Sequence, residues 1–340
     1  MILRNRLFLP LLLLAVFKQS DGKLRTDSLG VHEIIVYAIA PAAPINWHSP
    51  ATLYKSVKKS YINYYFHKQK RFLGHLAFSL QSSLLEKPIF QSIAAREKKD
   101  FFKQFFQRKI GLGVLGYPFQ SLLETDEYFR RSIASHARQR ELVVVRYQIN
   151  EAAAQRVLAF LNAFSKKGSD QVASSDYYGV AFWPLYEGEG AGCSALTIAA
   201  LEVAGIPLPE KEQWLVRCKI PITLMGRHSA NPHKVKLKRL RKTKNWYQGS
   251  GVENLDYVNF EIYDPLLFWN WVQKKRAIVT KEYEPATINN APGLQFDYRS
   301  IPAPANTPIF TPRPVENFFL KNYSTEMVPK KDSSIIGIGL

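Results

Sequence analysis

The chain reads YEGEGAGCSA over residues 186–195 and continues into the apolar run 196–204, which Gly205 ends. This pattern predicts a glycine-rich loop that passes directly into a helix, with Cys193 at the junction. Glycines allow the backbone to bend close to the sulfur, and the unpaired N–H groups of a helix start favour a thiolate. The stretch therefore predicts a nucleophilic cysteine, although a small apolar residue that begins a core helix fits the same pattern.

The predicted helix is apolar on nearly all sides, because only Glu202 is charged between Cys193 and Gly205. A helix of this kind is buried, here against a sheet. The rest of the chain has both strand and helix patterns, which indicates an α+β fold. Strands are expected at 33–39, 72–80, 110–116, 142–149, 214–225 and 257–263, a basic amphipathic segment at 91–107, and helices at 52–66, 129–139, 151–164 after an Asn150 cap, and 265–272.

Residues 1–22 have the pattern of a secretory signal peptide. Basic residues precede an apolar core at 7–17, and Ser20 and Gly22 supply small side chains at the cleavage site. We therefore expect an exported protein, periplasmic or secreted, whose mature chain begins near Lys23. No later segment approaches the ~20 apolar residues of a membrane-spanning helix, so no transmembrane segment is expected in the mature chain.

The composition divides the mature chain into two parts. Residues 23–284 are expected to form one α+β domain with helical insertions. Proline recurs after about residue 285, for example at Pro302, Pro304 and Pro312. Residues 285–340 are therefore expected to run over the surface as an extended C-terminal arm.

Cys218 is the second of the two cysteines in the sequence. It lies in the expected strand at 214–220, whose alternate positions are apolar, and this placement predicts a core thiol. In an oxidising compartment, a disulfide between Cys193 and Cys218 is an alternative to a free nucleophile. The sequence contains no cluster with metal-ligand spacing, so neither a metal nor another cofactor is expected.

The formal net charge of +18 predicts an anionic partner. For an exported protein we expect the partner to be an anionic cell-envelope polymer or lipid surface, and not nucleic acid. The alternative is that the lysine-rich faces bind no partner and are simply exposed to solvent. The densest basic run lies between residues 234 and 244. The candidate anion-binding residues in it are Lys234, Lys236, Lys238, Arg239, Arg241 and Lys242.

Four short stretches resemble motifs of one enzyme family. Tyr178-Gly179, the sequence GAGCSA at 190–195 and the closing AGIPLP at 204–209 resemble the nucleophile motif of NlpC-type papain-like cysteine hydrolases. GHLAFSL at 74–80 resembles the strand that opens with the catalytic histidine of that family. Because the histidine precedes the cysteine here, the resemblance is to the circularly permuted branch. It implies a papain-like fold with the cysteine helix packed on an antiparallel sheet or barrel.

The resemblance assigns roles to particular residues. Cys193 would be the nucleophile and His75 the base. The chemistry of a cysteine hydrolase also needs donors for the oxyanion, and the Cys193 N–H and the Tyr178 hydroxyl are the candidates. Two positions depart from the family pattern, since Gly192 replaces an acidic residue and Ala195 replaces glycine.

The sequence does not identify the residue that would orient the histidine. The family places it on the strand after the histidine, but the expected strand 110–116 contains no histidine, asparagine or acid. Gln81, Glu86 and Glu189 are the candidates. His228 and His233 are alternative bases in a non-permuted order, but they lie in a turn before the segment 234–240, which would be an exposed lysine-rich strand.

These features predict an exported thiol hydrolase or acyltransferase that acts on an amide or ester bond of a cell-envelope substrate. The resemblance implies a peptidoglycan peptide or a lipid as that substrate. The alternative is a catalytically inactive envelope-binding protein that keeps the fold.

Overall fold

A computed structural model describes residues 32–66, 73–124, 126–168, 172–278 and 280–324. The predicted signal peptide at 1–22 lies outside these described residues. The fold is α+β, with eight α-helices among the described residues and a large sheet that is mostly antiparallel. The α-helices are α1 (Pro50–Phe66), α2 (Lys98–Phe102), α3 (Asp126–Arg138), α4 (Glu151–Ser165), α5 (Cys193–Val203), α6 (Leu237–Lys242), α7 (Pro265–Arg276) and α8 (Phe318–Tyr323).

The large sheet has eight strands in the order β6-β4-β3-β2-β1-β5-β10-β9. Neighbouring strands are antiparallel except β10 and β5, which are parallel. The strands are β1 (His32–Ile39), β2 (His75–Gln81), β3 (Ile89–Ala95), β4 (Phe119–Glu124), β5 (Leu142–Ile149), β6 (Tyr177–Tyr178), β9 (Glu284–Ile288) and β10 (Ala291–Asp297).

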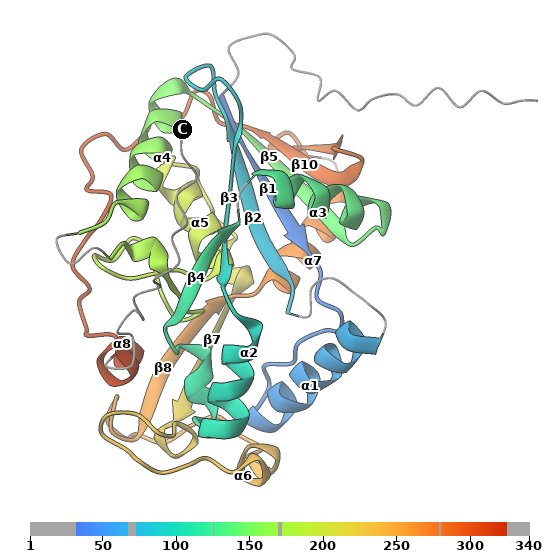
Figure 1. The fold of residues 1–340 in the computed structure, drawn as a ribbon. Coiled ribbons are helices and arrows are strands. Elements are labelled where there is room, and N and C mark those ends of the chain that lie inside the picture. Colours follow the sequence, from blue (N-terminus) through green and yellow to red (C-terminus); the bar gives the residue numbers. More distant parts are fainter. Residues whose placement is uncertain (1–31, 67–72, 125, 169–171, 279, 325–340) are drawn as a thin grey trace, which may run out of the picture.

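Both faces of the central strands are covered, which explains why β1 and β5 are almost continuously apolar in sequence. Alternate residues such as Val36 and Phe78 face α4, α5 and α7, whereas Tyr37 and Val144 face α3. Figure 1 shows α4 and α5 on one side of the sheet and α3 on the other. The apolar helix that carries Cys193 is therefore buried against the sheet, as its sequence predicts.

A second, two-stranded sheet consists of β7 (Leu215–Pro221) and β8 (Tyr257–Tyr263). It packs in a separate apolar core with residues of α1, α6 and α8. Cys218 lies in this core opposite Phe260, and burial raises the pKa of its thiol to about 12. Both cysteines are free, so the alternative of a bridge between Cys193 and Cys218 is wrong for this structure.

The prediction of a strand at 110–116 is wrong, because Leu112–Leu115 form a 3-10 turn, η2. Gly111 adopts a φ of +63°, which bends the chain away from an extended path. Gly113 and Gly116 then lie directly against Tyr323 and Phe319 of α8, where no side chain would fit. Glycine here allows close packing between distant segments rather than strand pairing.

The basic segments also differ from their predicted form. Residues 91–107 divide into the end of β3, the helix α2 and a π-helical turn, η1 (Lys103–Arg108). The segment 234–240 is not a strand, since α6 begins at Leu237. Both segments carry residues that pack inward, such as Gln104 and Leu240.

The prediction of an extended C-terminal arm is wrong for the first residues of that segment. Residues 284–297 form the hairpin of β9 and β10, and β10 completes the sheet beside β5. Asn289 and Asn290 form its two-residue turn with positive φ values of 52° and 60°, as a tight hairpin turn requires. The proline-containing segment 298–317 follows the surface as predicted. Arg156 of α4 donates a hydrogen bond to the Thr307 carbonyl, and Thr311 forms an isolated β-bridge with Tyr186.

Candidate active site

Cys193 is the first residue of α5, with Gly192 as the N-cap. Two backbone hydrogen bonds hold the preceding loop against β6. The Ala191 N–H donates to the Tyr177 carbonyl over 3.1 Å, and the Gly179 N–H donates to the Ala191 carbonyl. Gly190 sits so close to the Tyr177 carbonyl that a Cβ atom would overlap it. The glycine-rich sequence therefore permits the contact that places the sulfur at the helix start.

His75 is the first residue of β2, and α5 packs across that strand. The structure brings Cys193 and His75 together, so that the thiol hydrogen-bonds the imidazole and also accepts from the Leu76 N–H. The His75 side chain is buried, whereas Cys193 is partly exposed. The sulfur is thus reachable from one side while its partner is shielded.

A carboxylate and a hydroxyl hold the other side of the imidazole. Glu124 Oε2 lies 2.7 Å from His75 Nε2, and Ser92 Oγ lies 2.8 Å from the same nitrogen. Ser92 donates its own hydrogen to the Leu76 carbonyl, so its oxygen accepts from Nε2–H. With Nε2 protonated and held in this way, Nδ1 is the nitrogen left for the thiol.

Sequence reasoning missed Glu124 and Ser92 as orienting residues. They face each other in the register of β3 and β4. The sequence offered a weak signal for Glu124, an acid at the end of the short run FQSLLE at 119–124. The sequence pattern predicts the following strand at 110–116, whereas the strand that carries Glu124 is β4, formed by this run.

Burial and three neighbouring residues act on the acidity of Cys193. Burial by itself raises the pKa of the thiol. The charge and hydrogen bond of His75, the Leu76 N–H and the Ser194 hydroxyl outweigh that effect, and the pKa of Cys193 lies below its usual value. The site therefore favours a thiolate beside an imidazolium.

The other sequence-predicted orienting residues lie elsewhere. Gln81 is at the end of β2 opposite to His75 and pairs with Glu33, and Glu86 is exposed in the following turn. Glu189 is buried and contacts Arg313 Nη1 at 2.7 Å, which ties the loop before Cys193 to the C-terminal segment. Glu189 is therefore a structural residue of this loop.

Tyr178, the predicted oxyanion donor, lies on β6 and forms an isolated β-bridge with Ala191. It lines the same cavity as Cys193. The alternative bases are distant from this site. His228 packs against the rings of Phe318 and Tyr323, where burial lowers its pKa, and His233 is exposed. Neither histidine belongs to the cysteine site.

The predicted anion-binding residues do not line the cysteine site. Lys238, Arg239, Arg241 and Lys242 are exposed on α6, and Lys234 and Lys236 are exposed just before it. The helix α6 packs against α1, and the Ala51 N–H donates to the Thr243 carbonyl over 3.0 Å. These cations therefore form part of an outer face beside α1.

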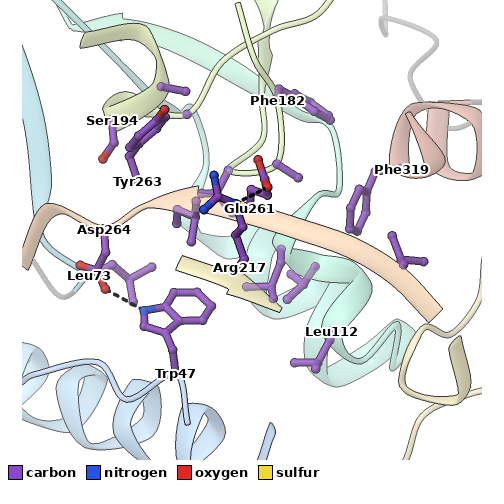
Figure 2. Close-up of a pocket in the computed structure, with 18 of the residues that line it drawn as sticks. Trp47, Leu73, Leu112, Phe182, Ser194, Arg217, Glu261, Tyr263, Asp264 and Phe319 are labelled. Atoms are coloured by element: carbon purple, nitrogen blue, oxygen red, sulfur yellow. Dashed lines mark hydrogen bonds and ion pairs between the residues drawn. The ribbon is translucent and has the colours of Figure 1, made fainter. Parts of the chain in front are cut away.

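A cavity of about 980 Å³ adjoins Cys193. Most of the side chains around it are aromatic or aliphatic, and Figure 2 shows Trp47, Leu112, Phe182 and Phe319 among them. The polar groups are largely paired: Trp47 Nε1 donates to Asp264 Oδ2 over 2.7 Å, and Arg217 Nε donates to Glu261 Oε1 over 2.7 Å. The space beside the thiol suits a long apolar group.

Comparison with known proteins identifies no relative of this chain. No protein-family model, no curated protein and no solved structure matches it. Among the described residues, no group of three or more histidine, cysteine, aspartate or glutamate side chains is placed to hold a metal ion. Within the same residues, no helix has both the length and the apolar character needed to cross a membrane.

Proposed function

We propose that this protein is an exported thiol hydrolase or acyltransferase with a permuted papain-like arrangement, and that it acts on an acyl ester or amide of a lipid. The observation that carries the proposal is the row Cys193, His75 and Glu124, in which each side chain contacts the next. A nucleophile, a base and an orienting group in this order are what acyl transfer to cysteine requires.

The proposed reaction has two steps. The Cys193 sulfur attacks the substrate carbonyl carbon, and His75 holds the thiol proton and gives it to the departing alcohol or amine. The N–H groups at the start of α5 face the developing oxyanion, with the Tyr178 hydroxyl as a second donor. Water or an acceptor alcohol or amine, deprotonated by His75, then attacks the thioester and releases the acyl product.

The cavity favours a lipid over a peptidoglycan peptide as the substrate. A stem peptide presents charged and amide groups, whereas most of the side chains that line the cavity are apolar, and charged ones such as Arg217 and Glu261 pair with each other. Transferring an acyl chain into such a space is favourable by about 0.8 kcal/mol for each buried methylene. An inactive binding protein would be favoured by a bridged or closed-off cysteine, but Cys193 is free and borders the cavity.

The test is to incubate the mature chain with p-nitrophenyl esters of short and long acyl chains and to follow both product release and intact mass. We expect faster turnover of the long-chain ester and a transient mass increase equal to one acyl group on Cys193. Cys193→Ser and His75→Ala are expected to abolish the increase, whereas Cys218→Ser is the matched control, since that thiol lies in the second core. Acylation that persists in Cys193→Ser would overturn the proposal.

A further inference from the structure

A row of aromatic rings runs from the turn η1 to the end of α1. The Phe106 ring stacks on Phe102 with centroids 5.9 Å apart, Phe102 meets Tyr61 edge-on at 4.9 Å, and Tyr61 stacks on Tyr65 at 6.4 Å. The row ends at Phe66, and the outer residues are exposed: Tyr65 by 67%, Phe66 by 71% and Phe106 by 45%. Exposed rings in one contiguous row mark an interaction surface.

Cations continue this row along the outer side of α1. Lys55, Lys59, Ile62 and Phe66 are all exposed and follow one another at helical spacing, so they form a single stripe. The neighbouring α6 adds Lys238, Arg239, Arg241 and Lys242, and neither helix contains an acidic residue. Figure 1 shows α1, α2 and α6 together at the lower end of the molecule.

We infer that this basic-aromatic face, formed by Lys55, Lys59, Ile62, Tyr65, Phe66 and Phe106 with the cations of α6, docks onto an anionic phospholipid bilayer. Helices that bind in the membrane interface combine lysine or arginine with aromatic and aliphatic side chains in this way. The lysines and arginines match the negative lipid headgroups, and the rings enter the boundary between headgroups and acyl chains. A hydrated anionic polymer offers nothing for the exposed Ile62 and Phe66 to enter.

The face is continuous with the cavity beside the thiol. Tyr61, Ile62, Phe102 and Phe106 belong to the aromatic row or its edge, and they also line the cavity that Cys193 borders. An acyl chain would therefore pass from the bilayer to the cavity along apolar side chains. This step rests on the proposed function, whereas the docking itself is independent of it.

Vesicle co-sedimentation of the mature chain tests the docking. The Cys193→Ala variant is measured beside the unaltered chain, so that docking is scored without catalysis. We expect binding to vesicles that contain phosphatidylglycerol and little binding to phosphatidylcholine vesicles. The double variant Lys55→Gln/Lys59→Gln is expected to bind about 30-fold more weakly, at about 1 kcal/mol for each cation. Ile62→Ser/Phe66→Ser is expected to bind at least about ten-fold more weakly.

Matched controls lie on other parts of the surface. Lys166→Gln/Lys167→Gln removes two exposed cations after α4, and Ile278→Ser/Ile301→Ser removes two exposed aliphatic side chains. Both are expected to bind as the unaltered chain does, and circular dichroism checks that every variant is folded. Equal loss in the controls, or no preference for phosphatidylglycerol, would overturn the inference. So would a dimer that Ile62→Ser/Phe66→Ser converts to monomer while vesicle binding stays unchanged.

Discussion

Glu124 Oε2 lies 2.7 Å from His75 Nε2, and both side chains are buried. Ser92 shares the same nitrogen, so two residues from adjacent strands orient one imidazole. A buried carboxylate in this position stabilises a protonated imidazole and thereby the thiolate on its other side.

Replacing Glu124 by glutamine is expected to make the Cys193 thiol less acidic. The amide keeps the shape of the side chain but removes the charge that stabilises the imidazolium. The midpoint of iodoacetamide labelling against pH is expected to rise by about one unit or more. Glu86→Gln is the control, because that side chain is exposed in a turn away from the site. An unchanged midpoint would leave Glu124 without a role in orienting His75.

The two thiols are expected to differ strongly in their pH dependence. The pKa of Cys193 is lowered, so its labelling is expected to begin at a lower pH than that of a free cysteine. Burial raises the pKa of Cys218 to about 12, so it stays protonated and unlabelled in the folded chain. Peptide mass mapping after brief labelling tests both statements. In His75→Ala the Cys193 midpoint is expected to move up to or beyond that of a free thiol.

Cys218 also affects stability at high pH. Its folded pKa is above that of an unfolded thiol, so its contribution to folding is complete below about pH 8.5 and decreases as pH rises toward the folded value of about 12. Cys218→Ala removes this contribution, so the free energy of unfolding of the variant is expected to fall less between pH 9 and pH 11 than that of the unaltered chain, by about 1 kcal/mol or more. Chemical denaturation at several pH values measures the difference. A parallel decline in both proteins would contradict the prediction.

Arg313→Ala is expected to destabilise the fold by about 2 to 3 kcal/mol. The substitution leaves the buried Glu189 carboxylate without the guanidinium that contacts both of its oxygens at 2.7 Å. Arg299→Ala is the control, since the ion pair of Arg299 with Asp297 is exposed and contributes less than about 1 kcal/mol. Urea unfolding distinguishes the two variants. Equal losses would mean that the Glu189 contact adds no more than a surface pair.

Local chemistry made several elements predictable from the sequence. Alternating or continuous apolar residues are confirmed as β1, β5 and β8, and Asn150 caps α4 by accepting from the Ala153 N–H over 2.9 Å. The apolar run after Cys193 is confirmed as a buried helix. Each of these signals depends on residues within a few positions of one another.

By itself, therefore, the sequence determined the α+β class, the position of Cys193 at a helix start and the apolar strand that His75 opens. The tertiary structure alone decided that Glu124 and Ser92 hold His75, that Glu189 pairs with Arg313, and that β9 and β10 complete the sheet. These relationships join segments far apart in the chain. Their strand register and side-chain contacts are set by packing of the whole core, which no local pattern encodes.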